Sequence, residues 1–305
     1  MKTLLFIIQI LVCICLAPLV SGLMRKIKNS LRMRKGAPVL QPYYNLGKYI
    51  KKEEVVSEHS SFILRYAPYV VLASTVTAFL FVPVFHYSCL LSEIGGVVAL
   101  FFFLSLGRFF LVLAGLDAGS SFGGMGSSRE MFIASLAEPV AICAMAVVGL
   151  KSGALHLPAA LNLVQTPVSV IVAATALLFV VIAETSRIPV DNQETHLELT
   201  MIHEAMVLEY SGRSLAILEL SAHIKQILLL SVLAGMLWPF PVYVPDSGAY
   251  LWSAAFFAGK VACIAVIVSV MEVMVAKMRL FRVVDFLGFG FLLSILALVM
   301  AGLGV

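Results

Sequence analysis

Residues Ile94–Leu116 read IGGVVALFFFLSLGRFFLVLAGL and contain a single ionisable side chain, that of Arg108. About 20 consecutive apolar residues in a helix are enough to cross the hydrocarbon core of a bilayer. Such a segment has to be helical, because a single strand in lipid would leave its backbone N–H and C=O groups without hydrogen bonds. The stretch therefore predicts one transmembrane helix.

Seven further stretches have the same apolar character. They are Leu4–Met24, Tyr66–His86, Met131–Leu150, Thr166–Ala183, Leu218–Leu237, Tyr250–Val275 and Val284–Gly304. Of the 305 residues, 61% are apolar and 12% are charged, whereas soluble domains average roughly 45–50% and about 25%. The sequence thus predicts an all-α polytopic membrane protein with about eight transmembrane helices, and residues 1–305 are expected to form one integral membrane domain. A soluble enzyme and a disulfide-stabilised secreted domain are excluded.

Basic residues are concentrated on alternate connections between these stretches. The segments 25–65, 117–130 and 184–217 and the connection before the last stretch together contain 16 Lys and Arg, against Lys2 and Lys151 on the other side. Cytoplasmic loops are rich in Lys and Arg. The pattern predicts that these segments are cytoplasmic and that both termini lie outside.

The first apolar stretch has two interpretations, a signal peptide or a transmembrane helix. A dense basic block beginning at Arg25 follows it directly, which is typical of a stop-transfer sequence. We therefore expect the first stretch to be retained as a helix rather than cleaved.

The connection from Glu184 to Arg213 carries the densest group of acidic side chains. Asp191 and Glu194 have the spacing of a capping box, which predicts the start of a helix, and Gly212 suits its C-terminal end. Glu194 and Glu198 are four residues apart and would share a helix face. Neighbouring carboxylates at a membrane boundary favour proton binding; a solvated acidic loop is the alternative.

Ionisable side chains also interrupt the apolar stretches. Glu138 precedes Pro139, whose ring leaves a backbone carbonyl without its helical hydrogen bond. Charged groups at such depths are costly and mark an ion pathway or a buried pair. We expect Glu138 and Glu272 to belong to such a pathway, with an interhelical hydrogen bond as the alternative. The others in apolar stretches are Arg108, Lys225 and Lys260.

The glycine-rich segment 117–130 is no phosphate-binding loop, because it lacks the Gly-Lys-Ser/Thr ending that such a loop needs. Ser127 and Glu130 have capping-box spacing, which predicts that the next helix starts there. The residues before them are expected to form a flexible cytoplasmic connection.

Cysteine and histidine spacing gives no sign of a metal site. The five cysteines include no C-x-x-C pair, and no two histidines are four residues apart. We expect no metal site and no iron–sulfur cluster in this chain.

Three groups of motifs stand out. One is Arg187-x-Pro189-Val190-Asp191 with Glu194, Glu198 and Glu209-Tyr210-Ser211-Gly212; another is LQPYYNLGK at 40–48 with Lys52-Glu53; the third is GLDAGS at 115–120 with GMGSSRE at 124–130 and Glu138-Pro139. With these motifs the chain resembles, over nearly its whole length, the subunit 1 family of respiratory complex I. The third group is most similar to the membrane-anchor subunits of group 4 nickel–iron hydrogenases, the branch that includes formate hydrogenlyase and hydrogenase-4 subunits.

The resemblance implies a subunit that joins a cytoplasmic redox arm to a membrane arm and carries no redox centre itself. The implied partners are peripheral hydrogenase-like and iron–sulfur subunits, which would hold the nickel–iron centre and the clusters, and antiporter-like membrane subunits; nucleic acid is not expected. Residues expected to relay proton or sodium coupling are Glu138, Glu184, Arg187, Asp191, Glu194, Glu198, Glu209 and Glu272. Residues expected at the partner interface are Gln41, Pro42, Lys48, Asp117, Arg129 and Tyr210.

Three alternatives remain open from the sequence. The first is a quinone-reducing complex I subunit, although no quinone motif can be identified. The second is a stand-alone secondary ion transporter, which receives no support from internal repeats. The third is a structural anchor for the redox arm that conducts no ions.

Overall fold

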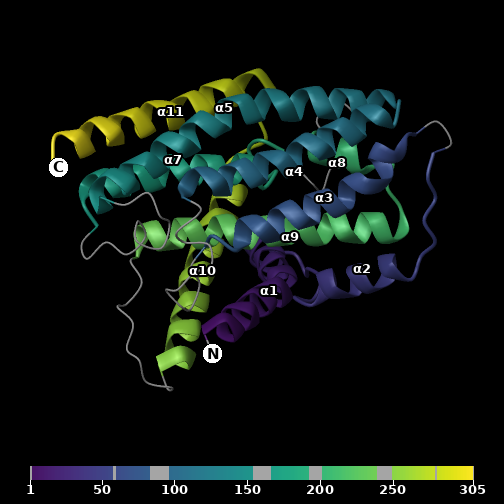
Figure 1. Cartoon of the computed structure of the whole chain (residues 1–305), viewed down its shortest axis with the longest axis horizontal. Coiled ribbons are helices and arrows are strands. Elements are labelled where there is room, and N and C mark those ends of the chain that lie inside the picture. The colour runs from purple at the N-terminus through teal and green to yellow at the C-terminus, as the bar shows by residue number, and fades with distance from the viewer. Residues whose placement is uncertain are drawn as a thin grey trace.

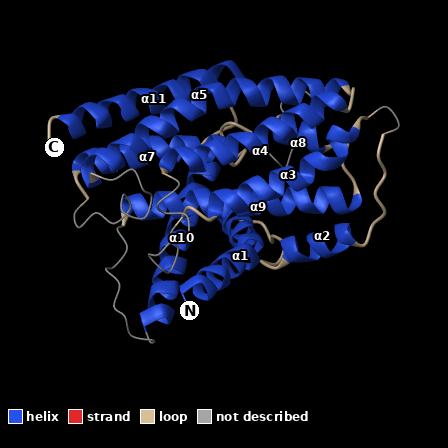
Figure 2. Cartoon of the chain, viewed as in Figure 1, coloured by secondary structure: helices blue, strands red, loops and turns tan. Residues whose placement is uncertain are grey.

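The structure is a computed structural model that describes residues 2–57, 60–82, 96–153, 166–191, 201–238, 249–278 and 280–304. These residues form α-helices and include no β-strand element (Figure 2). The helices are α1 (Lys2–Leu31), α2 (Gln41–Ile50), α3 (Phe62–Phe79), α4 (Val97–Asp117), α5 (Ser121–Ser152), α7 (Val168–Glu184), α8 (His203–Val207), α9 (Gly212–Leu237), α10 (Ala249–Met274) and α11 (Leu280–Gly302).

The prediction of an all-α polytopic membrane protein is confirmed. Among the described residues, seven helices are long and apolar enough to cross a membrane, namely α1, α3, α4, α5, α9, α10 and α11. The 17-residue helix α7 is apolar but shorter. Each predicted stretch corresponds to one of these eight helices, and the chain is a multi-pass membrane protein.

Helix α9 lies at the centre of the packing. It contacts α1, α2, α3, α7 and α10. In an apolar 18-residue segment of α9, 78% is buried inside the protein, against 28% for the corresponding segment of α11. Helices α5, α7 and α11 pack against one another, and α4 lies between α3 and α5. In Figure 1, α9 runs along the bundle while α1 and α10 cross its direction. The exposed apolar side chains of α11 then suit a lipid-facing position.

The start of α5 differs from the prediction. This helix begins at Ser121, and the side chain of Ser120 caps it by accepting the Gly123 N–H at 3.0 Å. Ser127 therefore does not cap the helix, and its Oγ instead donates to the carbonyl of Val112 in α4 at 3.0 Å. The interpretation of 117–130 as a flexible connection was wrong, because Ser120 already provides the cap that the helix needs.

Gly212 also has a different role from the one predicted. It is the first residue of α9 rather than the end of the preceding helix, which is the short α8. Its φ of +52° is accessible to glycine at little cost. A Cβ at this position would lie 2.6 Å from the carbonyl oxygen of Glu53, so a side chain would collide with the connection that precedes α3.

We expect Gly212→Ala to destabilise the protein by about 1–3 kcal/mol, because it combines a strained φ with a backbone collision. The measurement is the thermal unfolding midpoint of the purified chain in detergent. The matched control is Gly124→Ala in α5, where an added Cβ would meet nothing within 4 Å and alanine favours the helix. Equal midpoints for Gly212→Ala and the unmodified chain would contradict the assigned role of Gly212.

Candidate functional site

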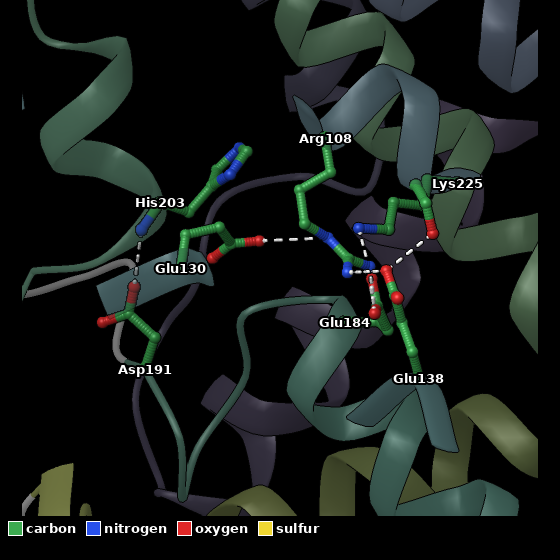
Figure 3. Close-up of polar contacts among 8 residues, drawn as sticks. Arg108, Glu130, Glu138, Glu184, Asp191, His203 and Lys225 are labelled. Carbon is green, nitrogen blue, oxygen red and sulfur yellow. Dashed lines mark hydrogen bonds and ion pairs between the residues drawn. The ribbon is translucent and has the colours of Figure 1, made fainter. Parts of the chain in front are cut away.

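A buried arginine organises the ionisable residues of four helices (Figure 3). Arg108 of α4 donates from Nη1 to Glu138 Oε1 of α5 at 2.8 Å and from Nη2 to Glu184 Oε1 at the end of α7. Its Nε lies 3.7 Å from Glu130 Oε1 of α5. Lys225 of α9 places its Nζ 2.6 Å from Glu184 Oε2. We call these five residues the arginine cluster.

The arginine cluster is largely enclosed by protein. The side chains of Arg108 and Glu184 are 6% and 8% exposed, whereas that of Glu138 is 38% exposed. A buried charge is strongly destabilising without a partner, and each carboxylate here faces a cation. The cluster holds three carboxylates and two cations, so it carries one excess negative charge when all five groups are ionised.

The residues around Arg108 fit α4 closely to its neighbours. Ser105, one turn earlier, donates its Oγ to Glu138 Oε1 at 2.6 Å and so gives that carboxylate a second hydrogen bond. Gly107 faces α3, where a Cβ would lie 2.4 Å from the Oγ of Ser74. The absence of a side chain at Gly107 therefore allows the close approach of α3 and α4 beside the cluster.

A second group of ion pairs holds the segment after α7. Arg187 Nη1 lies 3.0 Å from Glu272 Oε1 of α10, whose Oε2 lies 3.6 Å from Lys28 Nζ of α1. Lys277 Nζ lies 3.2 Å from Asp191 Oδ1. We call these residues the 187–191 network. Arg187 thus pairs with Glu272 and not with Glu184 or Asp191, its neighbours in the sequence, because other cations pair with those two carboxylates.

Asp191 stabilises the N-terminus of α8, which begins 12 residues later in the sequence. Its Oδ2 accepts the backbone N–H groups of Ile202 and His203 at 3.2 and 3.3 Å, at the N-terminus of α8. The carboxylate is 1% exposed. The predicted capping box with Glu194 extends beyond the described residues, as does the predicted Glu194–Glu198 face.

A cavity of about 310 Å³ connects the two groups of charges. Its lining includes Arg108, Glu130, Glu184 and Lys225 of the arginine cluster and Arg187 of the 187–191 network. A neighbouring cavity of about 240 Å³ is lined by Lys28, Asp191 and Glu272, and both cavities share the lining residues Arg25, Ser186 and Arg187. Ionisable side chains of the two groups therefore face adjacent internal spaces.

Several predicted site residues lie away from the arginine cluster. Glu209 lines a small pocket together with Arg65 and Tyr210, in the connection between α8 and α9. Among the predicted interface residues, Lys48 is exposed, Pro42 is buried in α2, and Gln41 donates to Asn45 one turn along the same helix at 3.1 Å.

The remaining predicted interface residues stabilise the protein's own fold. Asp117 Oδ2 accepts the N–H groups of Ser61 and Leu64 at the start of α3, at 2.9 and 3.2 Å. Tyr210 donates its hydroxyl to the Leu64 carbonyl at 3.1 Å, and burial, with help from the charge of Asp117, raises the pKa of this phenol. Arg129 donates to the Met201 carbonyl at 3.0 Å.

The sequence analysis did not predict that Arg108 is the central cation of the arginine cluster. Arg108 and Lys225 were recognised as ionisable residues within apolar stretches, but Glu130 was interpreted as part of a helix cap. The available signal was that Arg108 needs several anions in lipid, which three carboxylates on neighbouring helices supply. Among the described residues, no group of three or more His, Cys, Asp or Glu is placed to hold a metal ion.

The fold and the buried charges define a polytopic membrane protein with internal ion pairs, and comparison with known proteins identifies its family. The model of the family described as "NADH dehydrogenase" matches residues 2–302. The chain belongs to this family.

Individual relatives agree with the family assignment. The chain is 31% identical to hydrogenase-4 component C of Escherichia coli K12, over 95% of this chain and 92% of the relative. It is 28% identical to formate hydrogenlyase subunit 4 of the same organism, over 93% and 94%. NADH-quinone oxidoreductase subunit 8 of Rhodothermus marinus is 25% identical over 71% and 68%.

A solved structure shows the same fold. A chain of the membrane-bound sulfane sulfur reductase, an archaeal respiratory membrane complex, superposes with a TM-score of 0.85, covering 98% of this chain and 99% of that one. Sequence identity is 16%, so this similarity concerns the fold. The named relatives are components or subunits of larger assemblies.

We expect Arg108→Gln to destabilise the folded chain by about 3–5 kcal/mol, because it removes the cation that pairs with Glu130 and Glu138. Glu184 keeps its ion pair with Lys225. The double variant Arg108→Gln with Glu130→Gln should recover part of the loss, because it removes a buried carboxylate that Arg108→Gln leaves without a cation. The measurement is the monodisperse fraction in size-exclusion chromatography of detergent extracts. A double variant that is less stable than the single one would contradict the pairing.

Proposed function

We propose that this chain is the integral membrane subunit of a hydrogenase-like or complex I-like oxidoreductase. In this role it anchors a cytoplasmic redox arm and transmits proton or sodium coupling to antiporter-like membrane subunits. The redox centres, a nickel–iron site and iron–sulfur clusters, would belong to the partner subunits. The membrane would be the plasma membrane of a prokaryote, with both termini outside. Membership of the family and the names of the relatives support this assignment.

The single observation that carries the coupling role is the charge balance of the arginine cluster. Three carboxylates share two cations in a largely buried space, so one bound proton would neutralise the excess charge. A carboxylate that gains and loses a proton changes the charge of the whole cluster. Ionisable residues at membrane depth mark ion pathways by default, and the adjoining cavity provides space through which a proton could reach the cluster.

We expect Glu138→Gln and Glu184→Gln to preserve assembly and electron transfer to an artificial acceptor. Glutamine retains the size and the acceptor oxygen but cannot change its ionisation. The membrane potential formed by the complex in vesicles should fall at least ~10-fold, equivalent to about 1.4 kcal/mol of barrier. The control is Glu53→Gln, at an exposed position before α3. Undiminished potential in both the Glu138 and the Glu184 variant would leave only the anchoring role.

The partner assignment has a separate test. Purification of the chain in mild detergent should recover soluble subunits that carry iron–sulfur clusters and a nickel–iron or similar centre, detected by metal analysis and mass spectrometry. The physical reason is that the segments predicted to be cytoplasmic hold 16 basic residues, which suit docking of an acidic peripheral surface. Recovery of the lone chain or of a homodimer would favour a stand-alone transporter.

A further inference from the structure

A chain of hydrogen bonds crosses from α1 to α9 on the wall of the larger cavity. Ser21 Oγ lies 2.8 Å from His223 Nδ1 and donates to Gln226 Oε1 at 2.6 Å. Gln226 Nε2 in turn donates to the sulfur of Met24. Ser21, His223 and Gln226 all line the cavity and are nearly inaccessible to solvent.

The direction of these bonds determines which imidazole nitrogen carries the proton. Gln226 uses its oxygen toward Ser21, so the single hydroxyl hydrogen of Ser21 points to Gln226. Ser21 Oγ can then only accept from His223, which places a hydrogen on Nδ1. His223 Nε2 is consequently left without a hydrogen, as a buried acceptor with no hydrogen-bond partner among the described residues.

A second acceptor lies one helical turn before His223. Glu219 and His223 are four residues apart on α9, so both side chains lie on one face of the helix, and both line the cavity. Glu219 Oε2 is likewise buried without a hydrogen-bond partner in the described part of the chain. Buried polar atoms are rarely left unpaired. Two such acceptors on one wall therefore indicate a place that receives hydrogen-bond donors.

The charges around this wall determine which donor fits. The ionisable groups that line the same cavity are Arg25, Tyr49, Arg108, Glu130, Glu184, Arg187, His203, Glu204, Tyr210 and Lys225. Two of them, Arg25 and Arg187, place positive charge near His223 and disfavour a fixed metal cation beside it. A proton that His223 takes from Glu219 has its charge balanced, because the transfer leaves a carboxylate on Glu219 one helical turn away.

We propose that Glu219 and His223 form a proton-transfer pair that supplies the arginine cluster through the cavity. Both atoms lack a direct hydrogen-bond partner among the described residues, so the proton passes between them through water in the cavity that both residues line. In the net transfer the Oε2–H bond of protonated Glu219 breaks and an Nε2–H bond of His223 forms, which leaves a carboxylate one helical turn from an imidazolium. The imidazolium keeps its Nδ1–H bond to Ser21. Its Nε2–H bond then breaks and an O–H bond forms on Glu184, which lines the same cavity, and the ring is neutral again. This inference rests on the proposed coupling function and adds two residues to it.

His223→Asn is the decisive variant, because the asparagine amide can still donate to Ser21 Oγ but cannot bind a proton. In the intact complex reconstituted in vesicles, we expect electron transfer to an artificial acceptor to be unchanged and membrane potential to fall at least ~10-fold. Ser221→Ala is the matched control, since Ser221 lies on the same helix and lines the same cavity, and its hydroxyl donates to the Ile217 carbonyl at 2.7 Å. This control should retain both activities.

The outcomes separate this inference from the function on which it rests. Loss of potential in Glu184→Gln but not in His223→Asn would overturn the proton-transfer pair and leave the coupling function standing. Normal potential in both variants would overturn both proposals. A parallel loss of electron transfer or assembly in His223→Asn would identify His223 as a structural residue and also overturn the pair.

A second variant tests whether titration, rather than the hydrogen-bond chain itself, is what matters. Ser21→Ala removes the acceptor for Nδ1–H but leaves an imidazole that can still bind a proton at Nε2. We expect a loss of potential clearly smaller than that of His223→Asn. An equal loss would mean that the chain of hydrogen bonds is the essential feature, and the proton-transfer pair would be wrong.

Discussion

The burial of the Arg108 guanidinium is the constraint on which the arrangement of the central helices depends. A permanently charged group in an apolar helix has to be neutralised by anions held close to it. Those anions come from Glu130 and Glu138 of α5 and from Glu184 of α7, and Lys225 of α9 pairs with Glu184 in turn. The ion pairs therefore fix the positions of four helices relative to one another. Apolar packing alone would specify these positions less well.

The helices were predictable from the sequence, but the pairing of their charges was not. Apolar runs determine membrane spans through a property of the local sequence, so all eight stretches correspond to observed helices. Arg108 and Glu184 are separated by 76 residues, and Arg187 and Glu272 by 85. Spacing along one helix gives no information about contacts at such separations, and only the packing of α4, α5, α7 and α10 brings the partners together.

Short motifs misled where a small or polar residue fits more than one structural role. Serine followed three residues later by glutamate suggested a helix start at Ser127, yet this serine bonds to α4 from within α5. Glycine after a helix suggested a C-terminus at Gly212, yet a positive φ serves equally well at the entrance to α9. In each case a tertiary contact decided between roles that the local sequence allows.

The segment from Glu184 to Asp191 joins two groups of ion pairs. The arginine cluster has one carboxylate more than its cations. In the 187–191 network, Lys28 and Arg187 pair with Glu272, and Lys277 pairs with Asp191. Because Glu184 and Arg187 belong to different groups but lie three residues apart, a proton bound in one group changes the potential felt by the other. The short connection between α7 and α8 thus couples charge at the end of α7 to the contacts that hold α10 and α8.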